Sequence, residues 1–555
     1  MTAFLIANMA PIMFAALVIF LLSGFPVAFA LAANGLVFGF IGIELGLLKP
    51  ELMQAIPSRI FGIMSNDTLL AIPFFTFMGL ILERSGMAED LLDTIGQLFG
   101  PLRGGVAYAV IFVGALLAAT TGVVAASVIS MGLISLPIML KYGYDKKVAS
   151  GVIAASGTLA QIIPPSLVLI VMADQLGRSV GDMYQAAFLP GLVLTAMYAL
   201  YIFTLSIVRP KWVPALPMEA RNLRQANGDS GVISLSLLLC AASAASFAFA
   251  RYYQSKHPDI ATDTLSIYSA TIGIGFAFVL AFINRKFKIG LLSRMAEQVV
   301  FVLIPPLALI FLVLGTIFLG IATPTEGGGM GACGAILLAL LNGRLNLKLT
   351  KQALDSTTRL SCFVMFILIG STVFSLVFRG INGDLWVEHL LTGLPGGQIG
   401  FLIVVNILFF VLAFFLDFFE LAFILVPLVG PVAEKLGINL IWFGVLLGVN
   451  MQTSFMHPPF GFALFYLRSV APKAIRTSDI YWGAIPFVLI QIIMVGLIIA
   501  FPQLVSTDSV EAKKEEIQLD ISTPIDDTPA SSFDLPKEGG VDEMRDTQAT
   551  PAHVL

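Results

Sequence analysis

The chain has 555 residues, of which 57% are hydrophobic and only 12% are charged, with a net charge of −4 and a mean hydropathy of +0.92. A soluble protein carries about a quarter charged residues, so this composition excludes the soluble classes and predicts an integral membrane protein. The three cysteines and four histidines occur in no metal-ligand spacing, so neither a disulfide scaffold nor a transition-metal site is expected.

Apolar runs follow one another along the chain, each long enough for a membrane helix of about 20 residues. No run alternates as the strand of an outer-membrane barrel does, so the expected fold class is an all-α polytopic membrane protein. The first run lacks the basic start and the small-residue cleavage site of a secretory signal, and we expect it to stay in the protein as the first helix.

Residues 1–207 are predicted to form a first repeat of three spans, a re-entrant hairpin, a broken span and a final span. Two apolar stretches within 104–140 meet at a polar tip and are each too short to cross comfortably with their loop, which predicts the hairpin. In the broken span, 148–175, the sequence GTLAQIIPPS places Pro164 and Pro165 inside an apolar run. They remove amide donors and exclude the preceding residues from helical geometry.

Residues 208–295 are predicted to form a linker with two further spans, and residues 296–503 a second repeat with the same order of elements. Its hairpin is expected at 400–433, and its broken span at 438–468, around the sequence MQTSFMHPPF. The last segment, 504–555, is rich in Ser, Thr, Asp, Glu and Pro and has too little apolar surface to fold, so a disordered acidic tail is predicted.

Four features of the two halves pair at a nearly constant separation of 292 to 298 residues, as expected for a transporter built from internal repeats. If each half crosses the membrane an odd number of times and the linker crosses twice, the second repeat begins on the opposite side. The predicted symmetry is therefore inverted. The paired residues are Pro26 with Pro324, Thr68 with Leu360, Thr121 with Asp417, and Pro164 with Pro458.

Lysine and arginine are distributed unequally between the two sets of loops. One set holds 20 of the 31 basic residues, and loops rich in Lys and Arg face the cytoplasm. Both termini are then expected outside, in the periplasm, with the chain in a bacterial inner membrane. The basic set comprises the loops at 84–103, 141–147, 209–230, 285–296, 343–359 and 468–479.

Each broken span frees main-chain carbonyls that lipid cannot satisfy, so this backbone must face protein or a polar cavity. The neighbouring groups are hydroxyls and amides, which hard cations prefer as ligands, so a sodium site is predicted where each break meets its hairpin tip. Free amides at half-helix N-termini would attract an anionic cargo. The candidate sodium ligands are Thr120, Thr121, Gly122, Gly157, Thr158, Gln161, Ser166, Asp417, Gln452, Thr453 and Ser454, and the candidate cargo-facing residues are Ser127, Pro164, Pro165, Glu326, Glu420, His457 and Pro458.

These features also have purely structural interpretations. The paired prolines can form a packed kink, and Asp417 and Glu420 can reach water or pair with an arginine such as Arg379. Glu326 lies at capping-box spacing in ATPTEGGG, which is typical of a helix start. His457 can be a neutral packing histidine instead of a proton carrier.

Several motifs, taken in order, resemble the large membrane subunit of tripartite ATP-independent periplasmic (TRAP) transporters: LLAIPFFTFMG, GPLRGG, GTLAQIIPPS, GIATPTEGGG and HPPFG. The likeness covers nearly all of residues 1–503. It implies a sodium-driven importer of organic acids that works by an elevator movement of a transport domain against a scaffold. It also implies two partners, a small four-helix membrane subunit and a soluble periplasmic protein that delivers the cargo.

By position, the resemblance puts cation-binding elements at Thr120–Gly122 with Gly157–Ser166, and at Leu416–Phe418 with Gln452–Pro459. Three departures stand out. The second tip, FLDFFELAF, is bulkier and more acidic than is usual in the family. The first tip reads ATTGVVAAS, with fewer serines than is usual in the family, and GTLAQIIPPS replaces the usual GTIGPIIPPS.

The predicted function is secondary active transport of a carboxylate, with Na⁺ as the coupling ion, no other cofactor and no nucleic-acid partner. One alternative is a stand-alone divalent-anion/sodium symporter or antiporter of related inverted-repeat fold. Another is an intramembrane enzyme that uses Asp417, Glu420 and His457. A primary pump is not predicted, because the sequence has no nucleotide-binding motif.

Overall fold

A computed structural model of the chain describes residues 2–221, 231–258, 260, 262–458 and 461–505, and these form helices, turns and loops without any strand. They belong to one structural unit, residues 1–507. The predicted acidic tail lies outside the described residues from 506 onward, as does Pro459 of the second predicted cation element.

The first part of the chain forms α1 (Thr2–Ala7), α2 (Met9–Leu22), α3 (Val27–Glu44), α4 (Glu51–Met64), α5 (Asp67–Arg84) and α6 (Met87–Phe99). Helices α4 and α5 meet at an angle of 47°. Asn66 starts α5 by accepting a 2.9 Å hydrogen bond from the main-chain amide of Thr68, which satisfies a donor that the helix itself cannot. The Asn66 amide also donates to Asp174 at 2.6 Å, which joins the start of α5 to a helix far along the chain.

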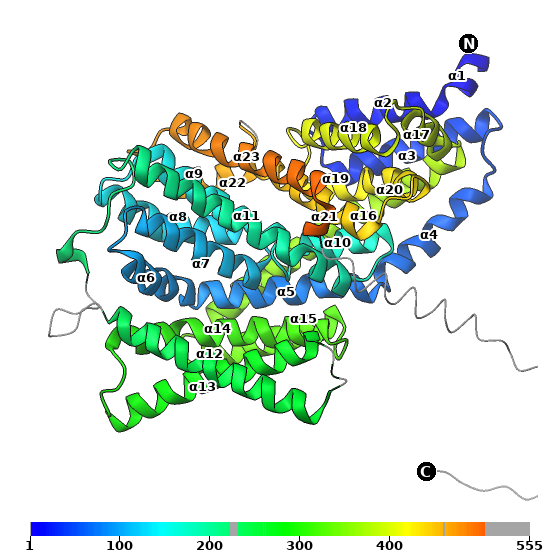
Figure 1. Ribbon diagram of the computed structural model, residues 1–555. Coiled ribbons are helices and arrows are strands. Elements are labelled where there is room, and N and C mark those ends of the chain that lie inside the picture. The colour runs from blue at the N-terminus through cyan, green and yellow to red at the C-terminus, as the bar shows by residue number, and fades with distance from the viewer. Residues whose placement is uncertain (1, 222–230, 259, 261, 459–460, 506–555) are drawn as a thin grey trace, which may run out of the picture. The chain divides into compact units, whose positions relative to one another are not determined.

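The next segment contains α7 (Gly105–Thr121), α8 (Val124–Lys141), α9 (Lys146–Thr158), the 3₁₀ turn η1 (Leu159–Gln161), α10 (Leu167–Leu176), α11 (Val180–Val208) and η2 (Met218–Ala220). Every residue of α9 from Val148 to Thr158 is buried. Helix α9 packs against α7, α8 and the late helix α23 (Thr477–Ala500), so it lies in the interior of the helical assembly (Figure 1).

The middle of the chain forms α12 (Val232–Lys256), α13 (Thr262–Phe287), α14 (Arg294–Phe318), α15 (Pro324–Leu341) and α16 (Leu347–Gly380). Helices α12 and α13 pack on each other and on α14. Helix α15 packs mainly on α5, and α16 mainly on α3, so two helices from the first part of the chain pair with two from the second.

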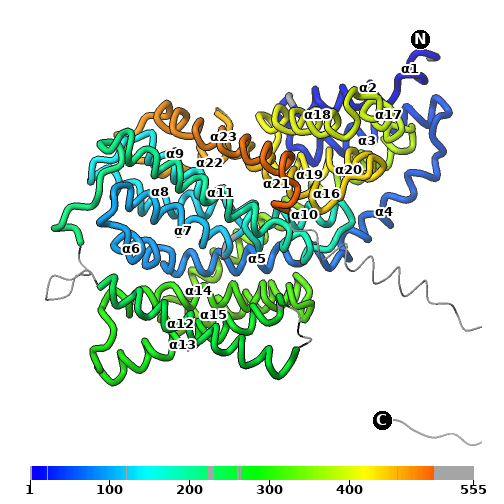
Figure 2. Tube along the Cα trace, viewed as in Figure 1, coloured from blue at the N-terminus to red at the C-terminus, as the bar shows by residue number. Residues whose placement is uncertain are grey.

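The last part forms α17 (Gly383–Thr392), α18 (Gly397–Leu412), α19 (Phe418–Ile424), α20 (Val426–Lys435), α21 (Leu440–Met451), η3 (Gln452–Phe455), α22 (Phe462–Val470), α23 and η4 (Pro502–Leu504). Helix α10 packs on both α19 and α21, which lie near it in the Cα trace (Figure 2). Segments from the first and the last parts of the chain therefore meet.

Within the described residues, nine helices are long and apolar enough to cross a membrane, or up to eleven if each of two bent pairs counts as one span. The chain is therefore a multi-pass membrane protein. One of the nine is α8, the second arm of the predicted 104–140 hairpin, and the hairpin itself stays a prediction. At about 1.5 Å per residue, the 18 residues of α8 reach nearly through the hydrocarbon core.

The predicted loop at 343–359 is wrong in its extent, because α16 begins at Leu347 and most of this segment is helical. The side chain of Asn346 accepts a hydrogen bond from the amide of Leu349 at 2.8 Å and caps the helix there. The helix therefore begins before the apolar run and contains Lys348, Lys351 and Arg359 of this segment, whereas Arg344 precedes it.

Candidate substrate and ion site

Helix α9 stops short of the two prolines, and the chain resumes helical geometry only at Leu167. Between them, the hydroxyl of Ser166 donates a hydrogen bond to the carbonyl of Gln161 at 2.5 Å. This accounts for one carbonyl that the sequence predicts to be free. The side-chain oxygen of Gln161 is buried and has no hydrogen-bond partner.

A second interruption separates α21 from α22. The chain passes through η3 after Met451, and α22 begins at Phe462. The hydroxyl of Thr453 donates to the carbonyl of Asn450 at 2.7 Å, whereas the hydroxyl of Ser454 is buried without a partner. Like the first, this interruption leaves a buried side-chain oxygen that is free to accept a ligand.

The two interruptions touch each other. The side-chain amide of Gln452 donates to the carbonyl of Thr158 at 2.7 Å, and both residues are fully buried. Gln491 of α23 reaches the same point, with its amide 2.9 Å from the hydroxyl of Tyr198 and 3.4 Å from that of Thr158. The side-chain oxygens of Gln452 and Gln491 have no hydrogen-bond partner. Two unpartnered acceptors therefore lie near the point where the two interruptions touch.

The first hairpin tip lies against the first interruption. Helix α7 ends with Thr120 and Thr121, and Gly122 follows with φ +57°, a left-handed conformation that glycine adopts without strain. A Cβ atom on Gly122 would lie 3.4 Å from the carbonyl oxygen of Pro165, which is van der Waals contact. The tip is therefore seated directly beside the cis Pro164–Pro165 segment.

The second tip uses its acidic residues to start a helix. The Asp417 side chain accepts from the amide of Glu420 at 2.9 Å, and the Glu420 side chain accepts from the amide of Asp417 at 2.9 Å. This reciprocal pair is a capping box at the N-terminus of α19. The amide of Glu420 at that terminus is thus satisfied by the protein's own carboxylate.

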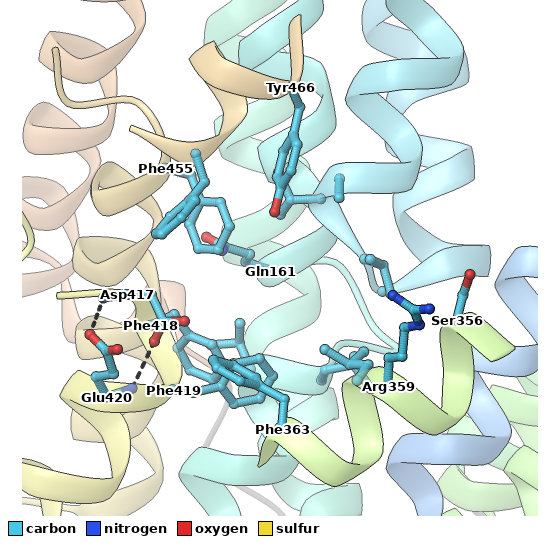
Figure 3. Close-up of a pocket in the computed structure, with 18 residues that line it drawn as sticks. Gln161, Ser356, Arg359, Phe363, Asp417, Phe418, Phe419, Glu420, Phe455 and Tyr466 are labelled. Carbon is cyan, nitrogen blue, oxygen red and sulfur yellow. Dashed lines mark hydrogen bonds between the residues drawn. The ribbon is translucent and has the colours of Figure 1, made fainter. Parts of the chain in front are cut away.

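A cavity of about 590 Å³ brings both tips and both interruptions together (Figure 3). Asp417 and Glu420 lie on one side in Figure 3, and Arg359 and Ser356 of α16 lie on the other. Gln161 projects from the first interruption, and Phe455 from the second. The residues lining it are Gly122, Val123, Val124, Ala125, Gln161, Leu167, Val168, Ser356, Arg359, Leu360, Phe363, Asp417, Phe418, Phe419, Glu420, Phe455, Phe462 and Tyr466.

Four of the candidate residues therefore line the cavity: Gly122, Gln161, Asp417 and Glu420. A second group is buried outside the cavity lining, in the two interruptions or on the helices that flank them. This group contains Ser127, Gly157, Thr158, Pro164, Pro165, Ser166, Gln452, Thr453 and Ser454. Pro458 follows the second interruption and is partly buried.

Two candidate residues lie in other surroundings. Glu326 is exposed at the start of α15, where it completes a capping box with Thr323 and does not line the cavity. His457 is buried against two aromatic rings, with its centroid 4.1 Å from that of Phe414 in a stacked arrangement and 4.4 Å from that of Phe410. These contacts agree with a packing histidine.

Sequence reasoning missed Arg359, Ser356 and Gln491. Arg359 was assigned to a cytoplasmic loop because the apolar run begins after it, and only the cap at Asn346 signals that the helix starts earlier. Gln491 is a single amide in the apolar helix α23, and such a residue is a signal of a buried polar contact. A further missed pair is Asn406 and Asn450, whose side chains are hydrogen-bonded at 2.9 Å between α18 and α21.

A polytopic all-helical protein with a charged cavity beside two interrupted helices belongs, by class, with the membrane transport proteins. The chain matches, over residues 14–504, the family described as "Tripartite ATP-independent periplasmic transporter, DctM component", and it belongs to that family. It is therefore a transport protein and not an enzyme, and it is one component of a tripartite system.

Three relatives illustrate the range of the family. The chain is 26% identical over 457 residues to the C4-dicarboxylate TRAP transporter large permease protein DctM of Pseudomonas aeruginosa, covering 82% of this chain and 89% of that protein. It is 25% identical to the ectoine TRAP transporter large permease protein TeaC of Halomonas elongata, covering 89% and 98%. It is 23% identical to the sialic acid TRAP transporter large permease protein SiaM of Vibrio cholerae, covering 87% and 94%.

Proposed function

We propose that this chain is the membrane subunit through which a sodium-driven importer moves an organic acid into the cell. One observation carries the proposal: both helix interruptions and both hairpin tips meet around a single cavity. That cavity is lined by the guanidinium group of Arg359 and by Gln161, whose buried side-chain oxygen lacks a hydrogen-bond partner. A carboxylate and its coupling cation need these two kinds of group near each other.

The unpartnered oxygens support Na⁺ as the coupling ion. Leaving a buried acceptor unpaired costs about 1–3 kcal/mol, and a bound cation would offset that cost. Oxygen ligands from carbonyls and amides are those that hard cations prefer. The oxygens are Gln161 Oε1, Gln452 Oε1, Ser454 Oγ and Gln491 Oε1, and the Thr158 carbonyl lies among them.

The second tip would supply negative charge to a sodium site. The capping box uses one oxygen of each carboxylate, from Asp417 and Glu420, and it fixes both groups at the edge of the cavity. A carboxylate held in this way is pre-organised for a cation, because little side-chain freedom remains to be lost on binding.

Two inverted repeats are the architecture that we propose. Support comes from the order of elements, because an interrupted helix followed by a long helix ends both α2–α11 and α14–α23, although α16 is one helix where α4 and α5 are two. Contacts between loops agree with the sidedness inferred from basic residues, because each joins two loops assigned to the same side. The pairs are Lys146 with Ala474, Arg344 with Asp90, and Arg178 with Glu434.

An elevator movement would then carry the hairpin tips and the helix interruptions across the membrane, past the wall that α16 contributes to the cavity. Helices α3, α4 and α5 pair with α15 and α16, which suits a scaffold, while α7 to α10 pack with α21 to α23 around the interruptions. Cargo would arrive from a soluble periplasmic binding protein. A small four-helix membrane subunit would complete the complex in the bacterial inner membrane, with both termini of this chain in the periplasm.

Uptake by proteoliposomes tests the proposal. The vesicles contain this chain, its small membrane subunit and, outside, the binding protein loaded with a labelled organic acid. We expect accumulation with an inward Na⁺ gradient and none with an equal K⁺ gradient. Vesicles that lack this chain are the control. Accumulation that is equal with Na⁺ and with K⁺ would contradict sodium coupling.

A further inference from the structure

We infer that the cavity selects an acid with a single carboxylate and an apolar, preferably aromatic, body, and that Arg359 binds that carboxylate. The inference rests on the proposed function, because it names the cargo of the same cavity. It goes further by choosing among cargo types as different as dicarboxylates, zwitterions and sugar acids.

Arg359 is the one cationic residue among those that line the cavity in the described part of the chain. It makes no ion pair there, although its neighbour one turn earlier, Ser356, accepts a hydrogen bond from Arg84 at 2.9 Å. A guanidinium group matches a carboxylate with two parallel hydrogen bonds. The cavity therefore offers one strong carboxylate site.

The opposite side of the cavity has no cationic side chain for a second carboxylate. Asp417 and Glu420 lie there, across from Arg359 in Figure 3, and they are the other two charged residues of the lining. A dicarboxylate bound to Arg359 would turn its second charge toward these acids or toward aromatic rings. Neither arrangement gives the second carboxylate a cationic side chain, and a buried charge without a partner is costly.

The wall between the two charged sides is aromatic. Phe363 of α16 and Phe419 of α19 meet edge to face, with ring centroids 6.1 Å apart. Phe455 and Phe462 form a second pair at 6.1 Å, and Tyr466 follows on the same helix as Phe462. Aromatic faces of this kind bind aromatic and other apolar groups by burial and by ring contacts.

The lining has few polar side chains that could form hydrogen bonds with a cargo rich in hydroxyl groups. Apart from the three charged residues, the polar side chains of the lining are those of Gln161, Ser356 and Tyr466. A sugar acid would leave several hydroxyl groups buried without partners, each at a cost of about 1–3 kcal/mol. A volume of about 590 Å³ is within the range of small-molecule sites, so size excludes none of the cargo types. The chemistry of the lining residues therefore determines which cargo is selected.

Equilibrium binding tests the inference without the selectivity of a delivery protein. The chain and its small membrane subunit are reconstituted in nanodiscs in NaCl, and labelled phenylacetate is the probe. Unlabelled phenylacetate, succinate, phenylalanine and N-acetylneuraminate are the competitors. We expect phenylacetate to compete better than each of the other three by about tenfold or more, a difference of about 1.4 kcal/mol.

Variants locate the site. Arg359→Gln is expected to weaken phenylacetate binding by about tenfold or more, and Arg359→Lys less, because lysine keeps the charge and loses the paired geometry. Arg379→Gln is the matched control, since Arg379 is an exposed arginine of the same helix outside the cavity, and wild-type binding is expected. Phe419→Leu should reduce the ratio of phenylacetate affinity to succinate affinity.

Three outcomes would overturn the inference. The first is stronger competition by succinate, phenylalanine or the sugar acid than by unlabelled phenylacetate. The second is wild-type binding by an Arg359→Gln variant of normal thermal stability, and the third is no phenylacetate binding. The sodium-driven uptake assay separates these results from failure of the proposed function. If the complex accumulates a dicarboxylate only with a Na⁺ gradient, the proposed function stands and the inference is wrong. If no acid is accumulated with Na⁺, both are wrong.

Discussion

The side-chain amide of Gln452 donates a 2.7 Å hydrogen bond to the main-chain carbonyl of Thr158, a residue 294 positions earlier in the chain. One residue starts the 3₁₀ turn of the second interruption, and the other ends the helix of the first. The two interruptions are thus directly coupled. A change at one of them should alter the other.

Replacing Gln452 by leucine tests this coupling. Gln452→Leu keeps a similar volume but leaves the Thr158 carbonyl without its donor and removes an unpartnered oxygen. We expect a loss of thermal stability equivalent to about 1–3 kcal/mol and a rise of about tenfold or more in the Na⁺ concentration for half-maximal uptake. Unchanged sodium dependence would place the ion elsewhere.

A second prediction separates the two roles of Asp417. Asparagine can replace aspartate as a helix cap, so Asp417→Asn should keep α19 and the thermal stability of the protein. It removes the negative charge, and the Na⁺ affinity measured by uptake should fall by about tenfold or more. Glu326→Gln is the control, because Glu326 also belongs to a capping box but lies outside the cavity. If Asp417→Asn behaves like this control, the carboxylate only caps its helix.

The third prediction concerns the close contact between α8 and α9. A Cβ atom on Gly157 would lie 2.2 Å from Val128 Cγ2, so Gly157→Ala must push these helices apart. Overpacking of this kind costs about 1–3 kcal/mol, which thermal unfolding in detergent would reveal. Gly62→Ala, in the helix α4 and with nothing within 4 Å of its Cβ position, should be neutral or slightly stabilising. Equal effects of the two substitutions would contradict the packing described.

The fourth prediction concerns the buried pair that joins α18 to α21. The Asn450 amide donates to the side-chain oxygen of Asn406 at 2.9 Å and to its carbonyl at 2.8 Å. Asn450→Leu leaves the side-chain oxygen of Asn406 without its donor and should destabilise the protein by about 1–3 kcal/mol. The double substitution with Asn406→Leu should cost less than the sum of the single ones, because it removes one of the stranded groups. Strict additivity would show that the pair is not coupled.

Much of the architecture follows from local chemistry. Apolar runs and scarce charge predict membrane helices, and the prolines at 164 and 165 predict where α9 cannot continue, since proline removes donors and restricts the preceding residue. The acids of the second tip carry a local signal too. The spacing of Asp417 and Glu420 is that of a capping box, the interpretation that fits Glu326 as well.

The site residues that sequence reasoning did not predict are positioned by contacts between distant segments. Arg359 lines the cavity because a helix start at Leu347 carries it inward, and its position relative to the acids is set by packing of α16 against α19. Gln491 reaches Thr158 only because α23 packs on α9. No pattern within one segment contains this information.

A structure of the complete complex, determined by electron cryomicroscopy in saturating NaCl with bound cargo acid, tests the central claim most directly. We predict density for the acid between Arg359 and the aromatic wall, and ion density within coordination distance of the Gln161, Gln452 or Gln491 side-chain oxygens. Acid bound away from this cavity, with these oxygens turned to new protein partners and no ion beside them, would contradict the account.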